Sequence, residues 1–299
     1  MRAQHRAPMT REGFRHMRKT VFKRATAVLL GAAAIALAAP AVQAGADSPS
    51  NPTSVQLRGG SALTAGQYLQ SGESQLVMQD DGNLVLYLVN TSGRRGPAVW
   101  SSGTYNNPGA HLAMQDDGNL VVYRQGGDTQ ANAVWSTSSW NNPGAYLTMW
   151  DGQVSLVTAQ GRGLWETKTG VSVAVGYGGP NPAGMFNSSR GLATGTWLKS
   201  NSVWLLNQQD GNVVLYRKSD GAALWSTHTA NRPKSIAFVE TTSNVAAIVM
   251  YAVDNGQTIW GTPVKGGPGT HAVVQDDGNF VVYNGSDQAV WSTGTWGNW

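Results

Sequence analysis

A unit of about 35 residues occurs six times in this sequence, and the repetition constrains the fold more than any other feature. The decapeptide at 78–87, MQDDGNLVLY, returns nearly unchanged at 114–123 and 274–283. Aligned on it, the six repeats end at Tyr87, Tyr123, Val157, Tyr216, Tyr251 and Tyr283. A tryptophan follows each: Trp100, Trp135, Trp165, Trp225, Trp260 and Trp291. A unit this short cannot bury its own apolar face. The six repeats are therefore expected to form two groups of three, each closed around a shared core.

The residue pattern within the repeats predicts an all-β protein. Short alternating apolar runs are broken by Gly, Asn and Pro, and no stretch after residue 44 keeps a helical apolar period. The repeated tryptophans follow apolar strands, so they are expected to fill a shared core around a pseudo-threefold axis. The sequence has no cysteine, which excludes disulfides, thiolate chemistry and Cys-ligated metals.

The N-terminal segment is typical of an export signal. Basic residues precede the apolar run AVLLGAAAIALAA at 27–39, and Val42-Gln43-Ala44 resembles a cleavage site. This run is too short to span a bilayer, so we expect no membrane insertion. The expected organisation is a signal peptide at 1–44, a flexible tail at 45–52 and two domains at 53–170 and 171–299, in a secreted protein cleaved near Ala44.

Charge argues against a nucleic-acid partner. Residues 1–44 hold 8 of the 21 Lys and Arg and 1 of the 17 Asp and Glu, which leaves 13 basic against 16 acidic groups and a formal net charge of −3. The basic footprint that nucleic-acid binding requires is therefore absent after residue 44.

The decapeptide predicts a β-hairpin in a particular register. Asp-Gly between alternating apolar residues is a strong hairpin signal that needs no ligand. A three-residue loop over 80–82, with Gly82 left-handed, pairs Gln79 with Asn83 and keeps both out of the core. Gln79, Asn83, Val85 and Tyr87 then share the outward face, and Asp81 leans over them.

Such a face can bind a sugar. It holds two amides, a carboxylate and a phenol around an apolar spot, whereas a sugar presents adjacent hydroxyls beside an apolar C–H face. It carries no activated nucleophile with a general base, so we expect a binding protein and no enzyme. No cofactor or metal is needed.

The spacing Gln-x-Asp-x-Asn-x-Val-x-Tyr resembles the mannose-binding signature of the bulb-type (monocot mannose-binding) lectins, and the lead-in GGSALTAGQYLQSGESQLVMQDDGNLVLY is similar to that family too. The resemblance covers roughly residues 53–299. It implies two tandem β-prism (type II) domains, each of three four-stranded sheets, in which Gln, Asp, Asn and Tyr hydrogen-bond mannose hydroxyls and Val packs on ring carbons. The positions so implied are Gln79, Asp81, Asn83, Val85 and Tyr87; Gln115, Asp117, Asn119, Val121 and Tyr123; Gln208, Asp210, Asn212, Val214 and Tyr216; and Gln275, Asp277, Asn279, Val281 and Tyr283. The expected partner is mannose or a related sugar on glycans or cell-surface polysaccharide.

Two repeats depart from the motif. Repeat 3 is one residue shorter and has Gln153, Ser155 and Val157 where Asn, Val and Tyr belong. Repeat 5 aligns Ser243, Val245, Ala247, Val249 and Tyr251 with the five positions and keeps only the tyrosine. Both repeats are expected to contribute to the fold without forming a sugar pocket. Repeat 4 is intact but has Asn207 at the place of Met78, which leaves its strand register open.

Other functions fit the residues less well. Asp-Asp-Gly-Asn offers oxygen ligands for calcium but lacks the further spaced acidic ligands and the distal Glu of an EF-hand loop. Paired carboxylates are also typical of glycosidases, but these lie in small repeated hairpins. His111 and His271 occupy corresponding places before a motif strand, which favours a structural role over zinc. Tandem bulb-lectin domains also resemble secreted lectin-like bacteriocins, which bind polysaccharide, for example with rhamnose, and kill related strains; this remains the alternative.

Overall fold

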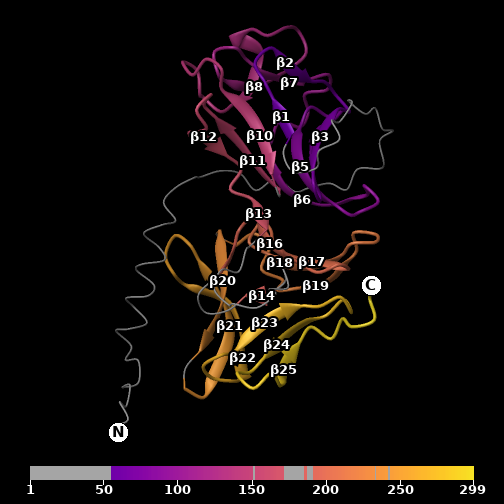
Figure 1. Cartoon of the computed structure of the whole chain (residues 1–299), viewed down its shortest axis with the longest axis vertical. Helices are drawn as coiled ribbons and strands as arrows, with labels where there is room; N and C mark the ends of the chain where they lie inside the picture. The colour runs from indigo at the N-terminus through magenta and orange to yellow at the C-terminus, as the bar shows by residue number, and fades with distance from the viewer. Residues whose placement is uncertain (1–54, 151, 172–184, 187–190, 233, 242) are drawn as a thin grey trace. The chain divides into compact units, whose positions relative to one another are not determined.

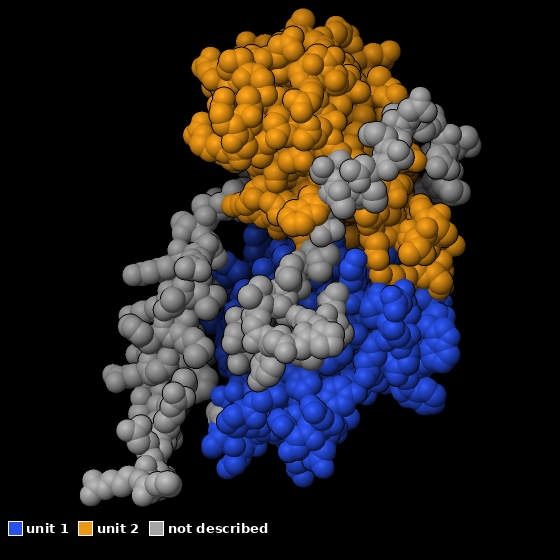
Figure 2. Space-filling view, viewed as in Figure 1, with its two compact units in different colours: residues 1–32, 172–217, 223–299 blue, residues 33–171, 218–222 orange. Residues whose placement is uncertain are grey.

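The computed structural model describes residues 55–150, 152–171, 185–186, 191–232, 234–241 and 243–299. The predicted signal peptide and tail lie outside these residues. The described residues form two compact units, coloured separately in Figure 2. The N-terminal unit comprises the described residues up to 171 with 218–222, and the C-terminal unit those of 172–217 and 223–299. Apart from one 3-10 turn, η1 (Gln130–Asn132), their regular structure is β-strand.

Three antiparallel sheets of four strands build the N-terminal unit (Figure 1). Repeat 1 forms the sheet β3-β4-β5-β6, and the early strands β2 and β1 complete the sheets of repeats 2 and 3, which run β2-β7-β8-β9 and β1-β10-β11-β12. The strands of these sheets are β1 (Val55–Leu57), β2 (Ser61–Leu63), β3 (Tyr68–Ser71), β4 (Ser74–Met78), β5 (Leu84–Val89), β6 (Arg95–Ser101), β7 (His111–Met114), β8 (Leu120–Tyr123), β9 (Ala133–Ser136), β10 (Tyr146–Trp150), β11 (Gln153–Val157) and β12 (Gly163–Glu166). The next strand in the chain, β13 (Gly170–Val171), belongs to none of the three.

The C-terminal unit follows the same plan. Repeat 4 contributes neighbouring strands β16 to β19, while β15 and β14 complete the sheets of repeats 5 and 6, which run β15-β20-β21-β22 and β14-β23-β24-β25. The strands are β14 (Met185–Phe186), β15 (Leu192–Ala193), β16 (Thr196–Lys199), β17 (Val203–Asn207), β18 (Val213–Arg217), β19 (Ala223–Ser226), β20 (Ser235–Thr241), β21 (Val245–Ala252), β22 (Thr258–Lys265), β23 (His271–Val274), β24 (Phe280–Tyr283) and β25 (Ala289–Ser292). The predicted all-β fold of two β-prisms is confirmed.

The repeated tryptophans meet inside each unit, as predicted. Trp100, Trp135 and Trp165 contact one another edge to face, with ring centroids 5.4 to 5.7 Å apart. In the C-terminal unit Trp225 contacts both Trp260 and Trp291 at 5.9 Å. Edge-to-face contact is a favoured geometry for aromatic rings. One tryptophan from each repeat therefore closes three sheets around a common axis.

Each repeat also has a β-bulge next to its tryptophan. Trp100 pairs with Leu86 on the core face, whereas Tyr87 pairs with Ala98, so Val99 is an extra residue in β6. The same register shift follows the tryptophan partner in all six repeats. A bulge re-aims the neighbouring side chains. The last residue of the motif therefore lies beside a β-bulge that the motif sequence does not predict.

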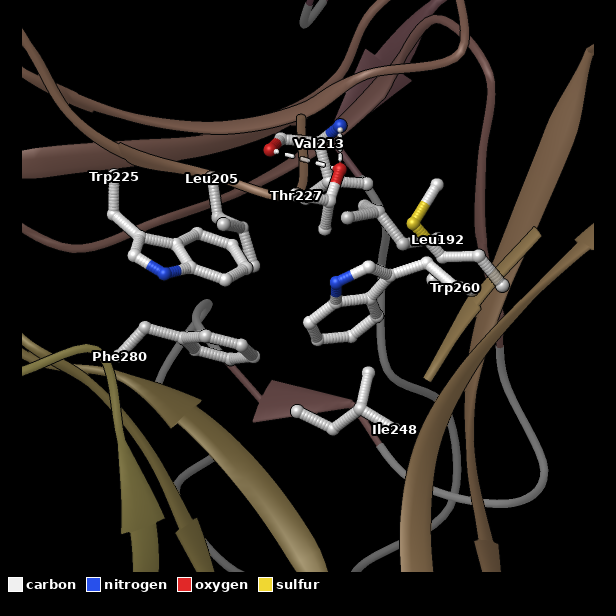
Figure 3. A pocket seen from close by; sticks show the side chains of 10 residues that line it. Leu192, Leu205, Val213, Trp225, Thr227, Ile248, Trp260 and Phe280 are labelled. Carbon is white, nitrogen blue, oxygen red and sulfur yellow. Dashed lines mark hydrogen bonds between the residues drawn. The ribbon is translucent and has the colours of Figure 1, made fainter. Parts of the chain in front are cut away.

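The C-terminal core encloses a small apolar cavity. Its volume is about 10 Å³, and Trp225, Trp260 and Phe280 line it with Leu192 and Ile248 (Figure 3). That is about the space of one water, and an apolar lining of this kind stays dry. A sugar cannot enter it, so ligand sites are to be sought on the outer faces of the sheets.

Candidate functional site

The hairpin of the decapeptide has the predicted register. Met78 pairs with Leu84, the Gln79 N–H donates to the Asn83 carbonyl over 2.9 Å, and the Gly82 N–H donates to the Gln79 carbonyl over 3.0 Å. Gly82 has φ of +87°, the left-handed conformation expected of it. Repeats 2, 4 and 6 close their hairpins with the same pair of bonds. In these four repeats we call the Gln, Asp, Asn, Val and Tyr of the motif the polar patch.

Within every polar patch the glutamine and tyrosine are hydrogen-bonded. The Gln79 Nε2 donates to the Tyr87 hydroxyl over 2.8 Å, across eight residues of chain. The corresponding distances in repeats 2, 4 and 6 are 2.8, 2.7 and 2.6 Å. Because the amide nitrogen is engaged, the glutamine oxygen and the phenol proton are directed to other partners.

The aspartate and asparagine are fixed by their own hairpin. The Asp81 Oδ1 accepts a hydrogen bond from the Asn83 N–H at 2.9 Å, and the same bond at the same distance recurs in the other three polar patches. A short Asx bond of this kind holds the carboxylate over the turn. The second carboxylate oxygen then faces outward.

A segment that sequence reasoning missed holds the asparagine in place. It follows the last strand of each sheet, and we call it the clamp loop: residues 102–107, 137–142, 227–232 and 293–298. The Asn83 Oδ1 accepts hydrogen bonds from the Ser102 hydroxyl at 3.1 Å and the Thr104 N–H at 3.0 Å. Repeats 2, 4 and 6 use Thr137 and Ser139, Thr227 and Thr229, and Thr293 and Thr295. In the sequence, the clamp loop can be recognised by a Ser or Thr two and four residues after the repeated tryptophan.

The internal bonds leave a defined set of groups for a ligand. Among the described residues, hydrogen bonds engage one polar side-chain atom each of Gln79, Asp81 and Asn83, together with one lone pair of the Tyr87 hydroxyl oxygen. What remains is two acceptors, the Gln79 Oε1 and Asp81 Oδ2, and two donors, the Asn83 Nδ2 and the phenol O–H. Repeats 2, 4 and 6 keep the same set.

The motif valine is less accessible than the sequence suggests. Val85, Val121, Val214 and Val281 are only 2 to 4 % exposed. Val121 lies on the outer face as predicted, but it packs there with Ala113 and Tyr123 in a small apolar cluster. The apolar floor of each polar patch is therefore narrow.

Burial perturbs three of the motif tyrosines. Loss of solvent raises the pKa of Tyr87, Tyr123 and Tyr216 above the ordinary 10.0, although the glutamine hydrogen bond opposes the shift. A raised pKa means that the phenol keeps its proton to higher pH. Its stabilising contribution is complete below pH 10 and is lost as pH rises through the raised pKa.

A pH dependence of ligand binding follows. We expect affinity to be constant from neutral pH to about pH 10 and to fall above it, because ionisation removes a donor and places charge in a desolvated site. Ligand titration alongside ultraviolet detection of phenolate measures both events. Loss of affinity well below pH 10, before any phenolate appears, would exclude the phenol as the donor.

Repeats 3 and 5 lack the patch, for different reasons. In repeat 3 the Gln153 Nε2 donates to Ser155 and Glu166 at 3.2 and 2.7 Å, so the amide is used internally. In repeat 5 the alignment of Ser243 with the motif glutamine is wrong. Pairing continues to Thr241 opposite Ala246, so the hairpin is longer, and Glu240 takes the glutamine position and accepts a hydrogen bond from Tyr251.

Asn207 does not disturb the register of repeat 4. It is fully buried and pairs with Val213, as Met78 pairs with Leu84. Its Nδ2 donates to the carbonyls of Leu192 and Ser235 at 2.9 and 3.2 Å, and its Oδ1 accepts from the Ser235 hydroxyl at 3.1 Å. Because its polar atoms are bonded, the asparagine fits the core.

The histidines flank two of the tyrosines. His111 stacks on Tyr123 with centroids 5.8 Å apart, and His271 stacks on Tyr283 at 5.7 Å. The His111 Nε2 lies 2.8 Å from the Asp128 carboxylate. Within the described ranges no three His, Cys, Asp or Glu side chains gather as metal ligands, and no helix there is long and apolar enough to cross a bilayer.

Several solved lectins are similar to this chain. A monocot mannose-binding lectin from Gastrodia elata is 32 % identical, with a TM-score of 0.32, over 39 % of this chain and 98 % of its own. The two-domain fetuin-binding agglutinin of Scilla campanulata is 24 % identical over 80 % of this chain and 99 % of its own, with a TM-score of 0.27. The mannose-specific snowdrop (Galanthus nivalis) agglutinin is 25 % identical over 42 % and 98 %, with a TM-score of 0.25. No family model and no curated protein matches the sequence. These three solved proteins are all lectins, and the one from Scilla campanulata has two domains.

Proposed function

We propose that this protein is a secreted lectin that binds mannose or a related sugar without a metal ion, through the polar patches of repeats 1, 2, 4 and 6. Repeats 3 and 5 support the fold. The assignment of mannose rests on the resemblance of the motif to that of the bulb-type lectins. The assignment to sugars in general rests on the geometry of the patches.

One observation supports the proposal most strongly: in the described part of the chain, four hairpins keep the same two acceptors and two donors without an internal partner. Adjacent sugar hydroxyls each donate and accept, so a hydroxyl pair can satisfy the Asp81 carboxylate and the Asn83 amide together. The Gln79 oxygen and Tyr87 hydroxyl then serve the next hydroxyl along the ring. Every internal bond fixes a side chain beforehand, which lowers the entropy cost of binding.

The same groups are unsuited to catalysis. The Asp81 carboxylate is bonded to a backbone N–H in an exposed turn, and the Tyr87 phenol is held by an amide. Neither arrangement activates a nucleophile, which needs an adjacent base. A shallow site with this inventory binds a lone monosaccharide weakly, and four sites on one chain gain avidity for branched or repeated glycans.

Changing each motif asparagine to aspartate tests the sites. Aspartate keeps the oxygen that accepts from the clamp loop but loses the outward donor, so the anchor is retained and the ligand bond is lost. Because Asn119 and Asn279 are only 9 and 7 % exposed, thermal unfolding of the variants checks that the added charge leaves the fold intact. One lost hydrogen bond is worth about 0.5–1.5 kcal/mol, or roughly 2- to 12-fold in affinity per site. We expect Asn83→Asp, Asn119→Asp, Asn212→Asp and Asn279→Asp together to abolish binding to a mannose-coated surface in EDTA.

The matched control is Asn255→Asp in repeat 5. It makes the same chemical change at a residue whose Oδ1 also accepts a backbone hydrogen bond, at 2.9 Å, but away from any polar patch. A second set, Tyr→Phe at 87, 123, 216 and 283, removes the phenol donor without adding charge. Full binding by both fourfold variants would disprove the sugar sites.

The alternative, killing of related bacteria after polysaccharide binding, stays a prediction from the sequence. It is compatible with the same four sites. Inhibition of bacterial growth by the intact chain, and its loss in the fourfold aspartate variant, would add killing to binding.

A further inference from the structure

Three large aromatic side chains are exposed at one equivalent place in the repeats. Tyr105, Trp140 and Trp296 are 49, 55 and 70 % exposed, and each lies five residues after the core tryptophan of its repeat. They belong to repeats 1, 2 and 6, which all have a polar patch. Repeat 4 has Ala230 at this place.

Each of these residues lies inside the clamp loop, between two points bonded to the polar patch. On one side of Tyr105, the Thr104 N–H donates to the Asn83 Oδ1 at 3.0 Å. On the other side, the Asn107 N–H donates to the Asp81 carbonyl at 2.9 Å. The backbone on both sides of Tyr105 is thus tied to the hairpin that carries Asp81 and Asn83 of the polar patch.

Repeats 2 and 6 repeat this arrangement. Trp140 lies between the Ser139 N–H, 3.1 Å from the Asn119 Oδ1, and the Asn142 N–H, 2.9 Å from the Asp117 carbonyl. Trp296 follows Thr295, whose N–H lies 3.2 Å from the Asn279 Oδ1, and precedes Gly297, whose N–H donates to the Asp277 carbonyl at 2.9 Å.

The clamp loop is rigid enough to present a ring. The Asn107 Nδ2 donates to the carbonyls of Thr104 and Tyr105 at 2.8 and 3.4 Å, and Asn142 bonds Ser139 and Trp140 in the same way at 2.9 and 3.1 Å. These bonds brace the loop from within. An exposed ring on a braced loop loses little entropy when a ligand stacks on it.

The ring supplies what the polar patch lacks. The motif valines are nearly covered, so little apolar surface meets the C–H face of a sugar. An indole or phenol ring is a large apolar surface, and binding sites combine such surfaces with a few polar groups. Beside Trp140 the surface also has a hollow of about 320 Å³, lined by Asn141, Asn142, Pro143, Thr158, Gln160 and Arg162.

We propose that Tyr105, Trp140 and Trp296 form a second sugar subsite next to each polar patch of repeats 1, 2 and 6. The terminal sugar occupies the patch, and the following sugar of the glycan stacks on the ring. Repeat 4, with Ala230, binds the terminal sugar alone. This inference rests on the proposed function and adds a preference for oligosaccharides in three of the four sites.

The test compares methyl α-mannoside with an α-linked mannobiose by calorimetric titration. For the intact chain we expect tighter binding of the disaccharide. In the variant Tyr105→Ala, Trp140→Ala, Trp296→Ala we expect monosaccharide affinity to be unchanged and disaccharide affinity to fall roughly tenfold, the loss of one good stacking contact. Trp150→Ala is the control, because Trp150 is 64 % exposed but belongs to repeat 3, which has no polar patch.

Repeat 4, which has Ala230 at the place of the aromatic residue, allows a gain-of-function test. With Asn83→Asp, Asn119→Asp and Asn279→Asp, the site of repeat 4 is the one left active, and adding Ala230→Trp should create a preference for the disaccharide. If the intact chain binds neither sugar, the proposed function fails and the subsite with it. If it binds both but the triple alanine variant keeps the full disaccharide preference, the subsite alone is disproved.

Discussion

Replacing Trp135, a partly buried member of the tryptophan triad, with alanine is expected to destabilise the N-terminal unit by about 3 kcal/mol, the lower end of the cost of removing a core aromatic side chain. Trp135 contacts both Trp100 and Trp165, at 5.7 and 5.4 Å, so its loss leaves a cavity where three sheets meet. For a unit of this size the melting temperature should fall by roughly 10 °C or more.

Trp140→Ala is the matched control for this substitution. It removes the same side chain five residues later, from a position that is 55 % exposed. We expect a change within about 0.5 kcal/mol, as for other surface positions. Differential scanning calorimetry of both variants gives the comparison. Equal melting temperatures for the two would show that the tryptophan triad does not hold the sheets together.

Gly118→Ala should be the second severe substitution. Gly118 has φ of +92°, and a Cβ there would lie 2.1 Å from the Asn142 carbonyl oxygen. A left-handed residue other than glycine costs about 1–2 kcal/mol by itself. Here the clamp loop must also move away from the hairpin. We expect a total of about 3 kcal/mol or more, together with loss of the repeat 2 site, because the Asn119 anchor moves with the loop.

The variant Gly127→Ala separates the backbone cost from the steric clash with the clamp loop. Gly127 has φ of +97° but nothing within 4 Å of an added Cβ, so it carries the backbone cost without the clash. Its destabilisation should stay within the backbone cost alone, about 1–2 kcal/mol. Thermal unfolding reports stability, and a titration of each variant in the Asn83→Asp, Asn212→Asp, Asn279→Asp background reports the repeat 2 site. If Gly118→Ala is no worse than Gly127→Ala, the clamp loop is not held tightly against the turn.

The sequence was sufficient for the features that one repeat determines by itself. The pairing of Gln79 with Asn83 followed from keeping two amides out of the core, and the tryptophan core followed from counting one tryptophan per repeat. Both arguments use only local chemistry and periodicity. Local reasoning failed where partners come from distant residues.

Asn207 illustrates that failure. As a polar residue at an apolar core position it left the register of repeat 4 open, and its partners, Leu192 and Ser235, belong to β15 and β20. Nothing near Asn207 in the sequence identifies them. In repeat 5, the position of Ser243 was wrong because alignment by the tyrosine assumed one hairpin length. Continued strand pairing lengthened the hairpin and brought Glu240 into the site. The Ser and Thr residues of the clamp loop can be read from the sequence. Their role follows only from the structure, which shows the asparagine that they hydrogen-bond.

The self-contained polar patch has a consequence for how such chains diversify. All groups that shape the repeat 1 patch lie between Gln79 and Asn107, whereas stability depends on tryptophans shared among three repeats. Binding valence and folding are thus encoded at different positions of one repeat. A substitution in one motif can therefore silence or retune one proposed sugar site while the other sites and the scaffold persist, and repeats 3 and 5 keep the β-sheet scaffold without the motif.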